Sequence, residues 1–206
     1  GAIAFHVALI FTGLLPNLVV RPVHLALALP WVFVIGAGGS LLSRLSGWLF
    51  AATGIAICTY IALHTDALGD QYGYTEGWLQ RTGGVLILLI VLEMARRAVK
   101  LALPALSVIA LAYGLFGEYL PGEFSHPGLP FDSLLGTLVI AEGGIWGPLT
   151  GVSVNVVAVF IVLGALVGAG HGGTGFMNVA TRLAGQLKGG AAKVSVLASA
   201  LFGSIS

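Results

Sequence analysis

Long apolar stretches separated by short polar ones run along most of this chain. Asp, Glu, Lys and Arg are absent from four long intervals, residues 1–20, 22–43, 45–65 and 143–181. A helix rises about 1.5 Å per residue, so some 20 apolar residues cover the roughly 30 Å hydrocarbon core of a bilayer. The pattern therefore predicts an all-α, polytopic integral membrane protein.

The interruptions between apolar stretches divide the chain into about six predicted transmembrane helices. Glycine, proline and charged residues mark most of their ends, as expected for helix boundaries. The predicted helices cover residues 2–15, 23–37, 48–64, 78–98, 101–116 and 145–167.

Two further stretches have helical periodicity with a single apolar face. The first carries Phe131, Leu134, Leu135, Leu138 and Val139, and the second carries Phe176, Val179, Ala180, Leu183 and Leu187. Both sets follow helical spacing. We expect two amphipathic helices that lie in the membrane interface, the first capped by Asp132 or Ser133.

The final stretch, residues 189–206, is apolar and uncharged after Lys193 but breaks into Gly203-Ser204-Ile205-Ser206. An apolar run of about 10–14 residues is too short to cross a bilayer and is typical of a re-entrant segment. Irregular backbone at membrane depth is tolerated where protein buries it or where it lines a cavity. We therefore interpret this stretch as the first arm of a re-entrant hairpin.

The broken end of this arm has the chemistry of a small cation site. Unpaired carbonyl groups and the helix dipole place partial negative charge at a helix C-terminus. The hydroxyls of Ser204 and Ser206 add oxygen ligands, so both are candidate Na⁺ ligands, and Gly203 permits a tight turn. Gly and Ser also promote close helix packing in membranes, and this second interpretation stays open.

Asn155 is the one strongly polar side chain well inside the predicted span 145–167. An intramembrane asparagine commonly donates a hydrogen bond to a neighbouring helix, and contact with an ion or a substrate is the competing interpretation. We keep Asn155 with Gly203, Ser204 and Ser206 as the candidate cation and substrate residues.

Composition supports a membrane protein and excludes several functional classes. The chain is 57% hydrophobic and 8% charged, with a mean hydropathy of +1.01, whereas soluble domains carry about 25% charged residues. A net charge of +1 gives no reason to expect a nucleic-acid partner. One cysteine, Cys58, cannot form a disulfide within the chain. The sequence also has no recognisable hydrolase, metalloprotease or phosphate-loop motif, so we expect neither an enzyme nor a bound organic cofactor.

The distribution of charge predicts the orientation in the membrane. Positive residues concentrate in cytoplasmic loops, and two basic clusters are present: Arg96, Arg97 and Lys100, and Arg182, Lys188 and Lys193. The acidic loops 66–76 and 118–132 then lie outside, and the N-terminus is cytoplasmic. Within the first cluster, Glu93 and Arg97 are four residues apart and are expected to pair on one helix face.

Several motifs resemble one transporter family. They are Glu93-Met94-Ala95-Arg96-Arg97, Tyr113-Gly114-Leu115-Phe116-Gly117, Glu142-Gly143-Gly144-Ile145-Trp146-Gly147, and Gly189-Gly190-Ala191-Ala192-Lys193-Val194 followed by residues 198–206. Together they look like the fused permease of tripartite ATP-independent periplasmic (TRAP) transporters, especially the TAXI type. The resemblance covers about residues 80–206.

The resemblance implies two regions and an incomplete chain. Residues 1–100 correspond to a small-subunit-like scaffold of four helices, and residues 101–206 to the N-terminal part of the large permease subunit. The second hairpin and most of the transport domain are missing, which makes this a truncated fragment of the permease. Ala191 stands where the family commonly has proline.

The resemblance also implies a function. Such permeases sit in the inner membrane of bacteria or archaea and import organic acids that a periplasmic binding protein delivers, driven by a Na⁺ or H⁺ gradient. The transport domain moves against the scaffold as an elevator. Gly203, Ser204 and Ser206 then fall on the tip of the first hairpin, where the family binds cation and substrate.

Three other functional hypotheses stay open at this point. One is a different cation-coupled carrier with re-entrant hairpins, such as a dicarboxylate or citrate carrier. Another is an intramembrane serine hydrolase that uses Ser204 or Ser206 with His171 as base, which requires an approach of about 3 Å. The last is a membrane scaffold that transports nothing.

Overall fold

The fold is all-helical, as the sequence predicts. A computed structural model of the chain describes residues 1–12, 15–36 and 41–203, and these residues form helices, turns and loops without a strand. Ser204 and Ser206, two of the predicted cation ligands, lie outside the described residues. Gly203 and Asn155 lie within them.

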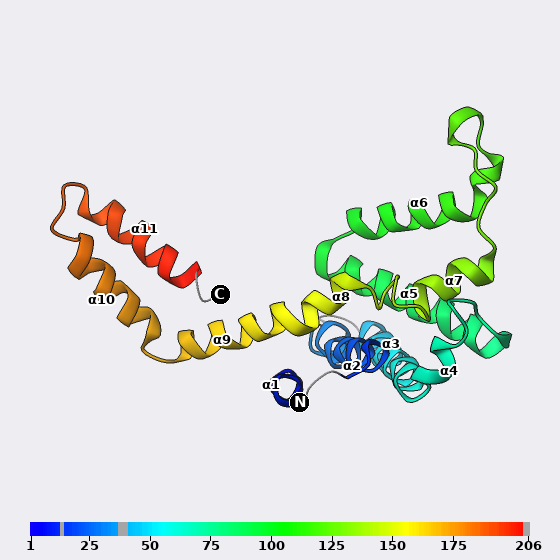
Figure 1. The fold of residues 1–206 in the computed structure, drawn as a ribbon, viewed down its shortest axis with the longest axis horizontal. Helices are drawn as coiled ribbons and strands as arrows, with labels where there is room; N and C mark the ends of the chain where they lie inside the picture. Colours follow the sequence, from blue (N-terminus) through cyan, green and yellow to red (C-terminus); the bar gives the residue numbers. More distant parts are fainter. Residues whose placement is uncertain (13–14, 37–40, 204–206) are drawn as a thin grey trace. The chain divides into compact units, whose positions relative to one another are not determined.

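The helices follow one another with short connections (Figure 1). In chain order they are α1 (Ala2–Thr12), α2 (Asn17–Pro30), the π-helical turn η1 (Trp31–Ile35), α3 (Leu41–Leu63), α4 (Thr65–Gly69), α5 (Gly77–Val99), α6 (Ala102–Phe116), the 3₁₀ turns η2 (Gly117–Tyr119) and η3 (Gly122–Phe124), α7 (Phe131–Val139), α8 (Pro148–Val152), the π-helical turn η4 (Ser153–Val157), α9 (Ala158–Ala169), α10 (Gly172–Ala184) and α11 (Gly190–Gly203).

Four helical stretches of the described chain are long and apolar enough to cross a membrane, fewer than the six predicted. They are Asn17–Ile35, Leu41–Leu63, Ala102–Tyr119 and Pro148–Ala169. The first predicted span forms only the 11-residue helix α1, about 16 Å long. The fourth forms α5, whose charge-free stretch between Arg81 and Glu93 is equally short. The prediction of about six spans is therefore wrong by this measure.

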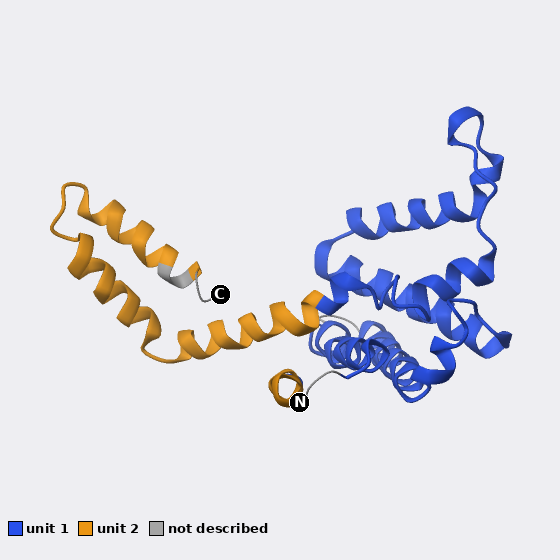
Figure 2. Cartoon of the chain, viewed as in Figure 1, with its two compact units in different colours: residues 1–2, 12–151 blue, residues 3–11, 152–206 orange. Residues whose placement is uncertain are grey.

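The chain divides into two compact units (Figure 2). Unit 1 comprises residues 1–2 and 12–151, and unit 2 comprises residues 3–11 and 152–206. Each unit is described by itself below.

The core of unit 1 lies among α2, α3, α5 and α7. Leu29, Phe33, Ile87 and Trp146 are fully buried in it. The apolar face of α7 packs into this core, since Leu135 is only 3% exposed, rather than resting on lipid as we expected for an interfacial helix. Helical periodicity identifies the apolar face of a helix but does not distinguish a protein core from a membrane.

A polar contact joins the loop before α5 to the first turn of α7. Thr75 is fully buried, and its hydroxyl donates a hydrogen bond of 2.7 Å to Asp132 Oδ1. The Arg81 guanidinium lies 2.5 Å from the same oxygen. The prediction that Asp132 or Ser133 caps α7 is wrong, because the N-cap position is Pro130, with no side-chain cap. The Asp132 carboxylate instead joins two segments that are distant in sequence.

Unit 2 contains α9, α10 and α11. Helices α10 and α11 pack side by side (Figure 1) and are joined by a turn in which Gly189 has a φ of +73°. The inner face of α10 is built on Ala180 and Ala184, and Ala198 of α11 is also buried. These small side chains permit the two helices to approach closely.

Candidate functional site

The described part of the predicted hairpin tip is the end of α11. The described part of this helix has 14 residues, about 21 Å at the usual rise, against a hydrocarbon core of roughly 30 Å. Gly203 is its last described residue and is exposed. A Cβ built on Gly203 would meet no described atom within 4 Å. No other described residue therefore fills the space beside Gly203, the residue that precedes the two predicted cation ligands.

Asn155 lies at the centre of the π-helical turn η4. The sequence predicts a membrane span over residues 145–167, and the structure places a π turn within a continuous span, Pro148–Ala169. Such turns widen the helix locally and occur often at functional sites. The Asn155 side chain is exposed, and no hydrogen bond joins it to another residue of the described chain. It is thus accessible to a partner or a ligand.

The candidate residues occur in two separate elements of unit 2. Asn155 is on η4 and Gly203 ends α11, and no hydrogen bond between the two is present in the described chain. The amphipathic α10 lies between them in sequence and packs on α11. That Asn155 and Gly203 belong to one site therefore stays a prediction from the sequence.

A second polar arrangement, which we did not predict, holds the segment 142–147 against the start of α2. The Asn17 amide donates a hydrogen bond of 2.6 Å to Glu142 Oε2, and the Arg21 guanidinium donates one to the Trp146 carbonyl. The Trp146 indole donates a hydrogen bond of 2.8 Å to the Val139 carbonyl. The resemblance had singled out residues 142–147, and these contacts show how the segment is fixed in unit 1.

Arg21 is a charged residue inside the candidate span Asn17–Ile35. Its Nε is buried without a hydrogen-bond partner among the described residues, and a Cβ on Gly151 would lie 3.0 Å from its Nη2. The sequence patterns described above do not single out Arg21. Its position four residues after Asn17, on the same helix face, is the signal that could have indicated a joint role.

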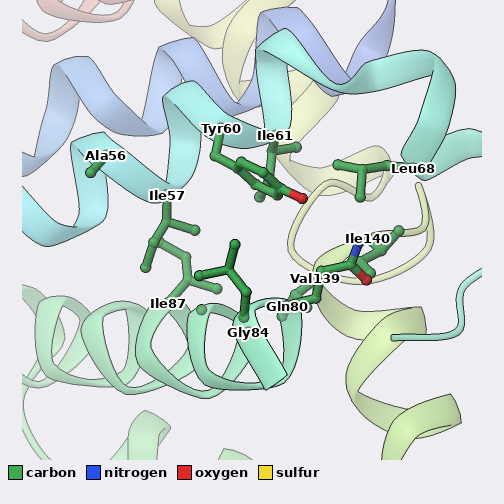
Figure 3. A pocket seen from close by; sticks show the side chains of 12 residues that line it. Ala56, Ile57, Tyr60, Ile61, Leu68, Gln80, Gly84, Ile87, Val139 and Ile140 are labelled. Atoms are coloured by element: carbon green, nitrogen blue, oxygen red, sulfur yellow. The ribbon is translucent and has the colours of Figure 1, made fainter. Parts of the chain in front are cut away.

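The best-defined cavity of unit 1 is apolar. It has a volume of about 220 Å³ and lies between α3, α5 and the end of α7 (Figure 3). Ile57, Ile87 and Val139 form its walls, with Tyr60 and Gln80 as polar residues and no charged residue in its lining. A carboxylate would lose its hydration there without gaining a cation, so this cavity is unsuited to an organic acid.

Clusters of metal-binding side chains are also missing from the described residues, where no group of three or more His, Cys, Asp or Glu side chains could hold a metal ion. Hard cations also accept backbone carbonyl, hydroxyl and amide oxygens as ligands.

Comparison with protein families decides which transporter the motifs belong to. Residues 86–206, more than half of the chain, match the family described as Tripartite ATP-independent periplasmic transporter, DctM component. The chain belongs to this family. The DctM family is a family of transporter permease components and not of enzymes. The DctM match and the four apolar spans together establish a multi-pass membrane protein. Searches of curated proteins and of solved structures found no match.

The DctM match also selects among the hypotheses drawn from the sequence. It favours the TRAP family over the dicarboxylate and citrate carriers. It begins at Leu86, within α5, and extends through residues 142–147 and α11. The division into regions 1–100 and 101–206 describes which subunit of the family each region resembles, and it stays a prediction from that resemblance. The compact units of the structure are a different division, which falls near residue 151.

Proposed function

We propose that the full-length protein to which this DctM chain belongs is a TAXI-type TRAP permease that imports organic acids. A periplasmic binding protein delivers the substrate, and an inward Na⁺ or H⁺ gradient drives its uptake through an elevator movement. The protein works in the inner membrane of a bacterium or archaeon, with the N-terminus and both basic clusters in the cytoplasm.

The observation that carries this proposal is the helix pair at the end of the DctM match. The described part of α11 is apolar and has 14 residues, it packs on the amphipathic α10, and a Cβ on its last described residue, Gly203, would meet no described atom within 4 Å. A short helix that ends at membrane depth directs its unpaired carbonyl groups at a cation, as the half-helices of secondary transporters do.

In this proposal Ser204 and Ser206 supply hydroxyl oxygens to a co-transported Na⁺ ion next to the end of α11. Gly203 keeps the backbone accessible, since any side chain there would occupy the open space around it. Asn155 contributes an amide that can accept from a substrate hydroxyl or donate to a substrate carboxylate. A neutral site of this kind binds the carboxylate of an organic acid more favourably once the cation is present, which couples the two fluxes.

The site is tested by substituting its hydroxyls in the full-length protein. We expect Ser204→Ala and Ser206→Ala each to raise the Na⁺ concentration needed for half-maximal uptake of a radiolabelled organic acid into proteoliposomes. Ser199→Ala is the matched control, because Ser199 is exposed on the same helix about one turn before Gly203. If the Na⁺ dependence of uptake is unchanged in both tip variants, the two hydroxyls are not Na⁺ ligands. If Ser199→Ala changes it equally, the effect comes from altering α11 and not from losing a ligand.

A further inference from the structure

A groove with a cationic end opens at the ends of three helices in unit 1. It has a volume of about 810 Å³ and lies between the start of α3, the end of α5 and the start of α6. Phe50, Leu89 and Leu92 form an apolar wall, and Arg96 and Arg97 lie at the charged end. The groove therefore combines the two surfaces of an amphiphile: an apolar wall and a positively charged end.

The two arginines share one carboxylate. Arg96 donates to Glu93 through Nε at 2.6 Å and through Nη2 at 2.8 Å, and Arg97 Nε donates to the same carboxylate at 2.8 Å. Glu93 is the one acidic residue in the groove lining. One negative charge against two positive charges leaves the groove with a surplus positive charge.

Arg96 and Arg97 differ in how firmly they are held. The Arg97 guanidinium lies 4.8 Å from the centre of the Phe33 ring, a cation–π contact, and its side chain is 20% exposed. The Arg96 side chain is 52% exposed. The Arg96 Nη1 donates no hydrogen bond to a residue of the described chain. Arg97 is thus held by contacts within the protein, whereas Arg96 has N–H donors available for a ligand.

Two further basic residues are close in sequence to residues at the groove. Arg44 follows Ser43, which lines the groove, and Lys100 follows the last residue of α5. Neither Arg44 nor Lys100 forms an ion pair with a described carboxylate. These charges lie in or next to the basic cluster that the positive-inside rule assigns to the cytoplasmic face.

We propose that this groove is a binding site for an anionic phospholipid. Arg96 holds the phosphate, and an acyl chain lies along Phe50, Leu89 and Leu92. Basic pockets between membrane helices on the cytoplasmic side bind anionic headgroups in this way. The apolar wall favours a lipid over a free phosphate ion, because an ion would leave most of the groove filled with poorly hydrogen-bonded water. This proposal does not depend on the transport function.

The test compares lipids on the delipidated full-length protein in detergent. We expect phosphatidylglycerol to raise the thermal unfolding temperature by about 3 °C or more at saturating concentration, and phosphatidylcholine with the same acyl chains to have a much smaller effect. Inorganic phosphate at an equal concentration is the third condition. Equal shifts from the two lipids, or no shift from either, would overturn the proposal, and a phosphate shift as large as that of phosphatidylglycerol would assign the site to a free anion instead.

The variant Arg96→Gln tests whether the lipid binds in this groove. Arg96 is the residue of choice because it is exposed, whereas Arg97 is packed on Phe33. We expect Arg96→Gln to weaken phosphatidylglycerol binding, measured by native mass spectrometry, about fivefold. Arg182→Gln is the matched control, since Arg182 is exposed on α10 of unit 2. Unchanged binding in Arg96→Gln, or equal loss in the control, would show that this groove is not the site. The comparison of lipids on the unsubstituted protein holds even if a variant fails to fold.

Discussion

The Trp146 indole nitrogen donates a hydrogen bond of 2.8 Å to the Val139 carbonyl, and the Trp146 side chain is completely buried. This contact folds residues 140–147 back onto the end of α7. The backbone carbonyl of Trp146 in turn accepts a hydrogen bond from Arg21 of α2. One side chain and its own carbonyl therefore connect α7, the segment before α8, and the first turns of α2.

We expect Trp146→Phe to destabilise the protein by about 1–3 kcal/mol, because phenylalanine keeps most of the buried area but leaves the Val139 carbonyl without its donor. The measurement is unfolding in detergent micelles by titration with dodecyl sulfate. Trp78→Phe serves as control, since Trp78 is 76% exposed and makes no such contact. A loss in Trp146→Phe no larger than that in Trp78→Phe would contradict the role given to the indole.

Two glycines on neighbouring helices should respond to alanine in opposite directions. A Cβ on Gly47 of α3 would lie 2.0 Å from the Phe33 carbonyl oxygen, a backbone atom that cannot move aside. Gly47→Ala should therefore cost about 1–3 kcal/mol. A Cβ on Gly83 of α5 would meet nothing within 4 Å, so Gly83→Ala should stabilise the helix by about 0.4–1 kcal/mol. Thermal unfolding of both variants in one detergent checks the pair, and a shift of the same sign in both would show that the close approach of α3 to η1 is not what Gly47 provides.

The Glu93 pair predicts a defined pH dependence. Glu93 lies near the end of α5, outside the four candidate spans. A hydrogen bond from Arg96 has the largest effect on the pKa of Glu93, and burial opposes it. A hydrogen bond from Arg97 and the positive charges of both arginines add to the lowering, so the pKa falls to about 2. A lowered pKa in the folded state means that the pair stabilises the protein above the unfolded value of about 4.5 and loses this effect as the pH falls toward 2.

We therefore expect Glu93→Gln to be less stable than the unsubstituted protein at pH 7, by about 0.2–0.5 kcal/mol for each lost pair. The difference should stay constant from pH 8 to pH 5 and shrink between pH 4.5 and pH 3. Thermal unfolding at these pH values measures it. A difference that grows on acidification would mean that Glu93 is not held in its charged form.

Much of the fold could be predicted from single helices, and much less from their contacts. Apolar periodicity located α5, α6, α7 and the span that contains η4 within a few residues, whereas α3 begins seven residues before its predicted start, and the spacing of Glu93 and Arg97 predicted their ion pair correctly. Arg21 and Trp146 are 125 residues apart. No local pattern indicates that these two residues meet, because such a contact depends on how helices pack.

The same distinction applies to the candidate site. The helical form of residues 190–203 follows from an apolar run, and the break after Gly203 stays a prediction because residues 204–206 lie outside the described part of the chain. Asn155 stood out as a polar side chain within a predicted span, yet the π-helical form of its turn did not, since that form depends on how a whole span accommodates an extra residue. Whether Ser204 and Ser206 complete a cation site remains a prediction.

The most direct test of the central claim is uptake of radiolabelled organic acids by proteoliposomes that contain the full-length permease, with its periplasmic binding protein and an inward Na⁺ or H⁺ gradient each present or absent. We predict accumulation only when the binding protein and at least one of the two gradients are supplied together, and its collapse when an ionophore dissipates the driving gradient. Accumulation that persists without the binding protein, or after both gradients are removed, would contradict the account.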